Sequence, residues 1–221
     1  MPSRPTIAIV QKDESVSWDA LAALLHEAYA EHARAGRHYT ACDQTPEATR
    51  RRVGDGHCFL AFVDGKLAGT ATLGELATPD APVRRGCIYQ VAVAPAFRSL
   101  HLGRAMLGHA EEVARQDGLA QLVCDTALSA TRLHAWYESM GWTRCGLLSH
   151  RGTNYYSIEF CKYLDGRRTG LHEKFRYLWQ CVATRAKLRP DGERRGWARL
   201  ARKIVRALKG RRADGAAGQT P

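Results

Sequence analysis

The sequence has no long apolar run and no paired-cysteine motif. No stretch approaches the roughly 18 consecutive apolar residues that a bilayer span needs, and no secretory-type apolar segment follows Met1. The seven cysteines stand singly, without Cys-x-x-Cys spacing, which argues against a disulfide framework and a zinc site. Internal repeats and low-complexity tracts are also absent from the sequence. We therefore expect a cytoplasmic protein without a metal site, whose cysteines are reduced and mostly buried.

Acidic residues are scarce in the last part of the chain. Residues 161–221 carry 17 Lys/Arg against 5 Asp/Glu, whereas residues 1–160 carry 16 against 17. The formal net charge of +11 therefore belongs to the C-terminal segment. The length of 221 residues suits one domain of about 160 residues plus an appendage. We predict a near-neutral domain over residues 1–163, a basic helical extension over 164–210 and a disordered tail over 211–221.

The stretch from Cys87 to Gly118 predicts a strand, a tight turn and a helix. Residues 87–93 are apolar and rich in β-branched side chains, and they stop before Pro95, as a buried strand does. From Gly103 onward, apolar residues recur at helical spacing. The first amides of a helix lack intrahelical acceptors, and the helix dipole favours negative charge at the same end. The turn at residues 98–103 therefore predicts an anion site, with phosphate as the expected anion.

This turn resembles motif A of the GNAT superfamily of N-acetyltransferases, in which Arg/Gln-x-x-Gly-x-Gly/Ala holds the pyrophosphate of acetyl-CoA. His101 stands where the first glycine is usual, so that its Cβ hinders close approach to phosphate, unless the imidazole points outward and adds a donor. The resemblance implies acetyl-CoA as co-substrate. It also implies a cofactor-binding set made of Val91, Ala92, Val93, Arg98, Ser99, Leu100, His101, Leu102, Gly103 and Arg104.

The predicted order of elements resembles the GNAT architecture over residues 6–160. We expect strands at 6–10, 58–63, 66–73, 87–93, 119–126, 143–148 and 155–160, and helices at 46–53, 103–117 and 130–140. A further helix, capped by Ser15 or Ser17, is expected to run to about residue 30, and Thr45 is the expected cap of the helix at 46–53. Asp64-Gly65 supplies the turn of a hairpin. The expected fold is α/β (α+β), with a mixed central sheet of about seven strands flanked by helices, plus a C-terminal helical hairpin.

A second resemblance, to motif B of the same family, covers residues 130–142. Tyr137 and Gly141 fit the usual pattern Ala-x-x-Leu/Phe-Tyr-x-x-x-Gly-Phe, whereas Leu133 and Ala130 replace an alanine and an asparagine, so one contact to the cofactor arm is expected to be absent. The resemblance implies that Tyr137 protonates the CoA sulfur, because a phenol with a pKa of about 10 stays protonated at neutral pH. The alternative is a packing residue whose hydroxyl bonds locally.

The resemblance also implies an oxyanion site and an acceptor side. Backbone N–H groups near Val91 and Val93 would face the thioester oxygen. In the resembled fold, the first two helices and the loop between them line the acceptor side, which makes His38, Tyr39 and Gln44 candidate substrate contacts. With Gln44, the candidate substrate residues are His38, Tyr39, Glu75, Asp125, His150 and Tyr155.

No general base stands out among the candidate substrate residues. Glu75 and Asp125 could each reach an amine through water, and His150 could act as base, substrate contact or surface residue. Holding the two reactants in line can supply much of the rate without a dedicated base.

The basic extension holds two amphipathic stripes. Leu171, Phe175, Leu178 and Val182 follow helical spacing, as do Trp197, Leu200, Ile204 and Leu208. Three interpretations remain open, in decreasing order of support: the stripes pack on each other or on the domain, residues 171–209 contact a membrane surface, or the arginines bind nucleic acid nonspecifically. The membrane interpretation would place the protein peripherally at the inner membrane surface, and a homodimer is compatible with the sequence.

Taken together, the two motifs predict an acyltransferase that moves an acetyl group from acetyl-CoA to a primary amine of a small molecule or sugar by direct transfer. A protein N-acetyltransferase is the nearer alternative. A non-catalytic GNAT-like binding module, placed at a membrane or nucleic acid by its basic tail, is the alternative from another class.

Overall fold

The computed structural model describes residues 4–77, 83–150, 155–167, 170 and 175–181. The chain divides into two units, residues 1–174 and residues 175–221. Of the second unit, the described part is a helical segment at residues 175–181, so most of the predicted hairpin and the whole predicted tail lie outside the described residues. In the described part of the chain, no helix is long and apolar enough to cross a membrane.

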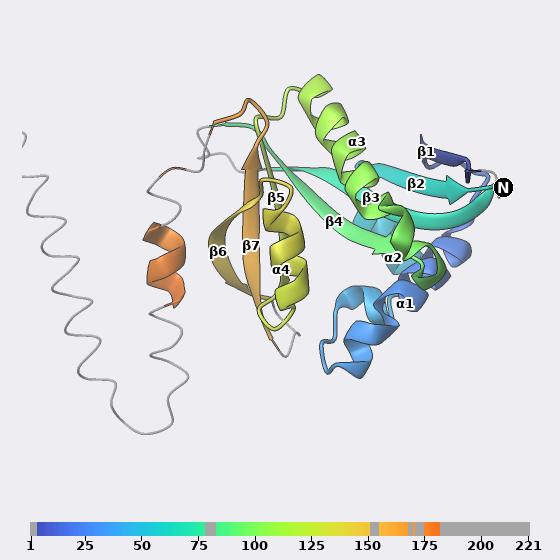
Figure 1. The fold of residues 1–221 in the computed structure, drawn as a ribbon, viewed down its shortest axis with the longest axis horizontal. Helices are drawn as coiled ribbons and strands as arrows, with labels where there is room; N and C mark the ends of the chain where they lie inside the picture. The colour runs from blue at the N-terminus through green and yellow to red at the C-terminus, as the bar shows by residue number, and fades with distance from the viewer. Residues whose placement is uncertain (1–3, 78–82, 151–154, 168–169, 171–174, 182–221) are drawn as a thin grey trace, which may run out of the picture. The chain divides into compact units, whose positions relative to one another are not determined.

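Seven strands form one mixed sheet, in the order β1-β2-β3-β4-β5-β7-β6 (Figure 1). Only β4 and β5 run parallel, and every other neighbouring pair is antiparallel. This confirms the predicted mixed sheet of the GNAT type. The strands are β1 (Ile7–Gln11), β2 (His57–Val63), β3 (Lys66–Leu76), β4 (Arg85–Val93), β5 (Gln121–Ala127), β6 (Thr143–Ser149) and β7 (Tyr156–Tyr163).

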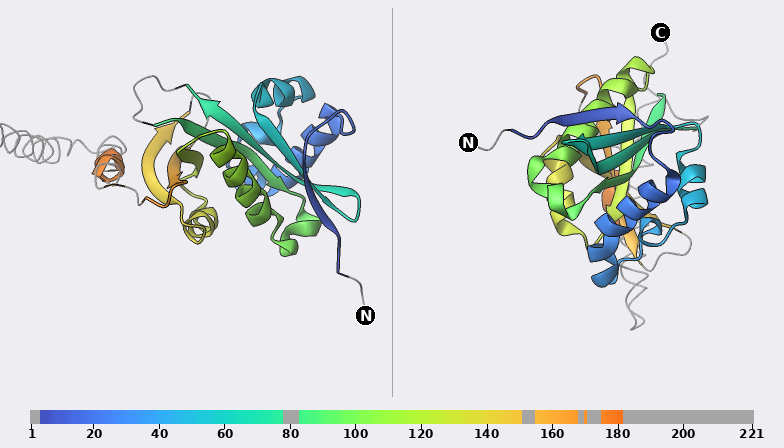
Figure 2. Two further views of the ribbon diagram at one scale, coloured as in Figure 1. Left: turned by 90° about the horizontal axis from the view of Figure 1, so that it is seen from above. Right: turned by 90° about the vertical axis from the view of Figure 1, so that its right-hand side faces the viewer.

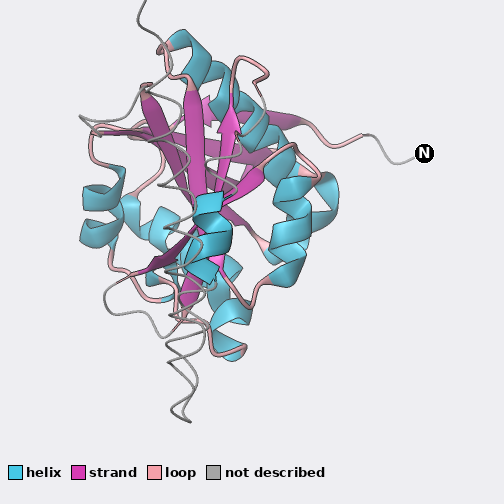
Figure 3. Ribbon diagram, turned by 90° about the vertical axis from the view of Figure 1, so that its left-hand side faces the viewer, coloured by secondary structure: helices cyan, strands magenta, loops and turns pink. Residues whose placement is uncertain are grey.

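Helices cover both faces of the sheet (Figures 2 and 3). On one face, α1 and α2 pack against β3, and α1 also contacts β4. On the other face, α3 packs across β2, β3 and β4, while α4 stacks Tyr137 on Phe160 of β7. The helices are α1 (Trp18–Arg34), α2 (Pro46–Val53), α3 (Leu102–Gln116) and α4 (Thr131–Glu138), with 3₁₀ turns η1 (Thr40–Cys42) and η2 (Pro95–Leu100).

The starts of α1 and α2 follow from their capping residues. Ser17 Oγ accepts from the amide of Ala20 at 3.1 Å, and Thr45 Oγ1 accepts from the amide of Ala48 at 3.1 Å. Each side chain satisfies a first-turn amide that has no intrahelical acceptor. Of the two predicted caps of α1 the structure uses Ser17, and it confirms Thr45 as the cap of α2.

The end of α1 differs from the prediction. The helix continues to Arg34 rather than ending near residue 30. The extra turn carries His32, whose ring lies 5.6 Å from that of Tyr29 and 5.1 Å from that of Tyr39. A tertiary aromatic cluster therefore stabilises a turn that shows no clear apolar period in the sequence.

The hairpin at Asp64-Gly65 forms as predicted, and its strands run further than expected. Asp64 and Gly65 have φ values of 47° and 76°, the left-handed values that a two-residue hairpin turn requires. Pairing between β3 and β4 continues to Leu76 opposite Arg85. Hydrogen bonding across strands extends the pairing beyond the apolar runs on which the prediction was based.

The core lies on both faces of the sheet. On one face, Leu21 and Leu24 of α1 form a buried cluster with Leu60 of β2. On the opposite face, Leu102 and Met106 of α3 are buried. Burying a side chain of this size stabilises a fold by about 1.5–3 kcal/mol. Because both faces are covered, the central strands are held firmly at the point where the site opens.

Candidate active site

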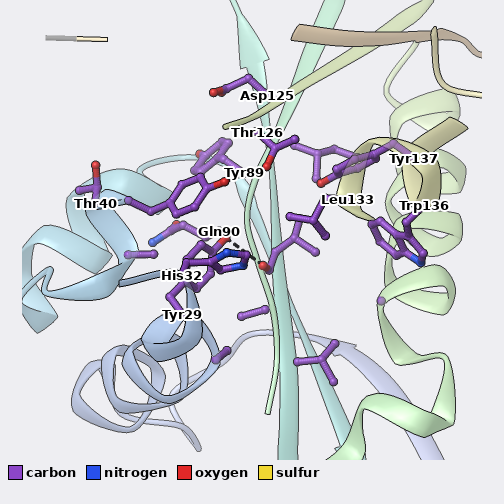
Figure 4. Close-up of a pocket in the computed structure, with 18 of the residues that line it drawn as sticks. Tyr29, His32, Thr40, Tyr89, Gln90, Asp125, Thr126, Leu133, Trp136 and Tyr137 are labelled. Atoms are coloured by element: carbon purple, nitrogen blue, oxygen red, sulfur yellow. Dashed lines mark hydrogen bonds between the residues drawn. The ribbon is translucent and has the colours of Figure 1, made fainter. Parts of the chain in front are cut away.

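A cleft of about 690 Å³ opens beside β4 (Figure 4). Tyr29 and His32 of α1 form one wall with η1, and Trp136 and Tyr137 of α4 form the other. Asp125, from β5, stands at one end of the cleft between these walls. Residues far apart in the sequence therefore meet around the edge of one strand.

The cleft exists because β4 and β5 separate. They pair only over residues 85–87, and Cys87 opposite Val123 is the last paired position. On its other side, β4 carries a bulge, since Thr70 pairs with Ala92 but Thr72 pairs with Tyr89. Such a bulge bends a strand and increases its twist, so β4 turns away from β5 and presents unpaired backbone to the cleft.

The bulge is held by side chains as well as by the sheet. Gln90 lies within it at a left-handed φ of 53°. The hydroxyl of Tyr29 donates to the carbonyl of Val91 at 3.0 Å, which ties α1 to the strand edge. The Gln90 side chain is 4 % exposed, and its Oε1 accepts from the Thr72 hydroxyl at 3.3 Å. These contacts position the backbone of residues 91–93, three of the predicted cofactor-binding residues.

The turn from η2 into α3 has the geometry that an anion site needs. His101 takes the left-handed conformation, with φ 55° and ψ 23°, and its side chain does not cap the helix. The capping residues of α1 and α2, in contrast, each accept from a first-turn amide. The first-turn amides of α3 therefore receive no side-chain acceptor from their N-cap residue and suit a bound anion.

Gly103 lets α4 approach the first turn of α3 closely. A Cβ at this position would lie 3.1 Å from Cζ2 of Trp136, tighter than an ordinary contact. The Arg104 guanidinium donates to Ser139 Oγ at 2.9 Å, directly after α4. These two contacts explain why a glycine suits this position of the turn.

The Arg98 side chain is engaged by α1 rather than by the turn. Its Nη1 lies 2.6 Å from Glu31 Oε2, and its Nη2 donates to the Ala28 carbonyl at 3.0 Å. The pair Arg98–Glu31 thus joins the turn to α1. In this arrangement the turn presents backbone amides to an anion.

Tyr137 is buried, and its environment favours the neutral phenol. The ring lies 5.3 Å from that of Phe160 and 5.8 Å from that of Trp142. Burial, followed by the neighbouring Cys124 thiol, raises the pKa of Tyr137 well above its ordinary value. The phenol therefore keeps its proton at neutral pH while lining the cleft.

Four rings form an aromatic wall on the predicted acceptor side: Tyr29, His32, Tyr39 and Tyr155. Tyr39 is central, with ring centroids 5.5 Å from Tyr29, 5.1 Å from His32 and 5.1 Å from Tyr155. Its hydroxyl lies 2.9 Å from Thr126 Oγ1 and accepts from the amide of Ala127 at 2.9 Å. The aromatic wall is therefore joined to β5.

Asp125 and His150 form an acid–imidazole pair at the cleft. Asp125 Oδ2 lies 3.0 Å from His150 Nε2, and both residues line the cavity. Their side chains are 33 % and 45 % exposed, respectively, so water and a substrate can reach them. A carboxylate next to an imidazole holds the ring in one orientation.

Several predicted residues lie away from the cavity lining. His38 is exposed in the loop after α1, and Glu75 pairs with Arg84 at 2.9 Å, near the end of β3 that is remote from the bulge. Leu102 is buried in the core against β3. The remaining predicted residues outside the lining are Ser99 and Leu100, both in η2, and Gln44, which is buried and bonds to Thr49 of α2.

Most of the predicted set does come together around the cleft. The predicted residues that line it are Tyr39, Val91, Ala92, Val93, Arg98, His101, Gly103, Arg104, Asp125, Tyr137, His150 and Tyr155. Their individual roles stay predictions.

The lining residues that were not foreseen include Tyr29, His32, Arg52 and Gln90. Gln90 offered a signal, since it is the one polar amide within an apolar strand. Tyr29 lies on the apolar stripe of its helix and reads as core. Arg52 follows two other arginines, and nothing in the sequence separates it from them.

The mixed sheet opens between two parallel strands, and a helix N-terminus and a buried tyrosine lie at the opening. This arrangement is typical of the acetyltransferase class that the two motifs resemble. Residues 18–142 match the acetyltransferase (GNAT) family. The chain belongs to this family, which uses acetyl-CoA as co-substrate.

One curated relative is the streptothricin acetyltransferase of Streptomyces lavendulae, which is 36 % identical over 103 residues. The match covers 45 % of this chain and 52 % of the relative, so the chain spans about half the length of the curated relative it matches.

Solved structures share the fold at lower identity. A putative GNAT-family acetyltransferase from Desulfovibrio desulfuricans superposes with a TM-score of 0.56 at 21 % identity, over 72 % of this chain and 99 % of that one. The ribosomal-protein-S18-alanine N-acetyltransferase of Escherichia coli gives a TM-score of 0.53 at 19 % identity, over 75 % and 96 %. At these identities the likeness concerns the fold alone.

Proposed function

We propose that the protein transfers an acetyl group from acetyl-CoA to a primary amine of a small molecule, directly and within a ternary complex. The observation that carries this proposal is the meeting of Tyr137 and the Asp125–His150 pair in one cleft, with the bulged edge of β4 between them. A small-molecule acceptor is also supported by the similarity to a streptothricin acetyltransferase.

The residues of the cleft fit acetyl-CoA. The uncapped first turn of α3 and the Arg104 guanidinium would hold the pyrophosphate, and the backbone of residues 91–93 would hold the pantetheine arm. Gly103 keeps this region open, because a side chain there would press on Trp136. When bound, acetyl-CoA supplies the carbonyl carbon that the amine attacks and the thiolate that leaves.

Two protein groups manage the protons of this transfer. As the C–N bond forms and the C–S bond breaks, the amine must lose a proton and the departing sulfur must gain one. Tyr137 is the proposed donor, since its raised pKa keeps the phenol protonated. The Asp125–His150 pair is the proposed acceptor, directly or through one water, because it is the cleft's exposed acid–imidazole pair.

Calorimetry with acetyl-CoA and a thiol-release assay test the proposal. We expect acetyl-CoA to bind and free thiol to appear with at least one small amine, at rates above those with peptides that carry a free N-terminus or lysine. Binding of acetyl-CoA without thiol release on any amine would reassign the protein as a binding module. Release with peptides alone would move the acceptor class to proteins.

A further inference from the structure

Arg52 brings a positive charge to the acceptor side of the cleft. Arg52 lies in the last turn of α2 and lines the cavity, and its Nη1 donates to Gln44 Oε1 at 3.2 Å. Its charge acts on Tyr29 and Tyr155 of the aromatic wall, where it opposes the rise in pKa that burial causes. Arg52 is therefore placed among the acceptor residues, on a different element from the turn that suits the pyrophosphate.

The carboxylates that line the cleft are already engaged by other groups. Glu31 pairs with Arg98 at 2.6 Å. Asp125 pairs with His150 at 3.0 Å. In the described part of the chain, no carboxylate forms an ion pair with Arg52. A partly buried guanidinium in a cleft, without an internal counter-charge, suits an anionic ligand group.

A buried relay of hydrogen bonds positions the Arg52 guanidinium. Thr49 donates its hydroxyl proton to the Thr45 carbonyl at 2.9 Å and accepts from Gln44 Nε2 at 2.7 Å. Because Thr49 has only one hydroxyl proton, the Gln44 amide must present its NH₂ group to Thr49 and its Oε1 to Arg52. Gln44 is 4 % exposed and Thr49 is fully buried, so the relay is part of the core. It holds one N–H of Arg52, and a guanidinium has five.

Gln90 adds a second donor to the same lining. Its Nε2 is buried and has no hydrogen-bond partner among the described residues, while its Oε1 is occupied by Thr72. An unpaired buried donor costs about 1–3 kcal/mol, so a ligand atom that accepts from it is favoured. The unused hydrogen-bonding capacity of Arg52 and Gln90 thus consists of donors, which is what a carboxylate requires.

We propose that the acceptor carries a carboxylate close to its amine and that Arg52 binds this carboxylate, with Gln90 as a further donor. The substrate class is then amino acids and compounds with the same amine–carboxylate pair. The Arg52 fork matches a carboxylate bidentately, and the amine lies toward Asp125 and His150. This inference rests on the proposed acetyltransferase function and narrows its acceptor class.

The test compares matched acceptors on matched variants. A panel of L-amino acids is assayed for thiol release beside the corresponding amino-acid amides, which keep the amine and the side chain but lack the carboxylate. Arg52→Gln removes the charge, Arg52→Lys keeps the charge without the fork, and Arg51→Gln removes an exposed charge from the same helix. The same ligands are added to the protein–coenzyme A complex in a thermal-shift assay, which reports binding without turnover.

We expect the wild type and Arg51→Gln to prefer the acid over its amide. In Arg52→Gln, kcat/KM for the acid should fall by about 10- to 100-fold, as for loss of a charged hydrogen bond, while kcat/KM for the amide stays within about threefold. Arg52→Lys should retain part of the preference, and the acetyl-CoA affinity should not change in any variant. The thermal shift caused by the acid should be lost in Arg52→Gln.

Two results would separate the proposals. If the amide is as good a ligand and substrate as the acid, or if Arg52→Gln lowers both equally, the carboxylate site is wrong and the acetyltransferase proposal stands. If the acid binds in an Arg52-dependent way but no amine releases thiol, the carboxylate site stands and the acetyltransferase proposal fails.

Discussion

The two halves of the cleft are built in different ways. The half proposed for the cofactor, called the cofactor half below, comes from one contiguous stretch, residues 91–104, and presents mainly backbone: a bulged strand edge and an uncapped helix start. The half proposed for the acceptor, called the acceptor half below, is made by side chains from α1, η1, α2, β5 and the residues between β6 and β7. Backbone geometry suits a constant ligand, whereas side chains from many elements can change one by one and set specificity.

The largest effect should come from a residue that acts between the two halves. Tyr137→Phe removes the proposed proton donor, so kcat should fall about 100-fold, the lower range for general acid catalysis. The acetyl-CoA affinity should stay within about twofold, because the ring and its packing on Phe160 remain. Steady-state kinetics and calorimetry measure the two quantities. Tyr156→Phe, on β7 outside the cleft lining, is the control, and an equal loss of cofactor affinity would contradict the assignment.

A smaller effect should be confined to the acceptor half. Asp125→Asn removes the charge that holds the His150 imidazole, so kcat/KM for the amine should fall by about 10- to 30-fold in steady-state kinetics. The matched control is Glu75→Gln, which removes a carboxylate that pairs with Arg84 away from the cleft. If both variants keep wild-type rates, the base is supplied by neither predicted carboxylate.

In the cofactor half, the informative change is one of stability. His101→Gly places the preferred residue at a left-handed φ of 55°, where a Cβ costs roughly 1–2 kcal/mol, and glycine's larger unfolded-state entropy offsets about half of that. We expect a net gain of about 0.5–1 kcal/mol in denaturant unfolding and an acetyl-CoA affinity equal to or above that of the wild type. His101→Ala keeps the Cβ, so this variant should not gain stability. Weaker cofactor binding in both variants would instead indicate that the imidazole contacts phosphate.

The smallest effect concerns the pH dependence of stability through His32. Burial, and then the positive charge of Arg37, lower the pKa of His32 in the folded state. As the pH falls below about 6.5, the unfolded chain therefore binds this proton first. The contribution of His32 to the free energy of unfolding is complete above that pH, and it is lost as the pH falls toward and through the folded-state pKa. Urea unfolding at pH 7.5 and 5.5 should show a smaller loss of stability in His32→Gln than in the wild type, and an equal loss would contradict the assignment.

Residues chosen from the sequence line the cleft where local geometry decides their position. Tyr137, His101 and Gly103 lie in runs whose spacing is set by a single turn or helix, and all three line the cleft. Glu75 was chosen because it is acidic and near a strand end, but the register of β3 with β4 carries it away from the cleft and next to Arg84. Arg52 was not predicted because it differs from Arg51 only through the packing of α2. That packing places Arg52 in the cleft lining and leaves Arg51 exposed.

By itself, the sequence determined the order of the strands along the chain, the helix cap at Thr45, the Asp64-Gly65 hairpin and the turn before α3. Each depends on backbone preferences and hydrogen bonds within a few residues. Only the tertiary structure decided where β4 leaves β5, and hence which side chains meet beside it. That separation depends on strand pairing and on contacts such as Tyr29 with Val91, which join residues 62 positions apart. Long-range pairing of this kind leaves no short-range signal in the chain.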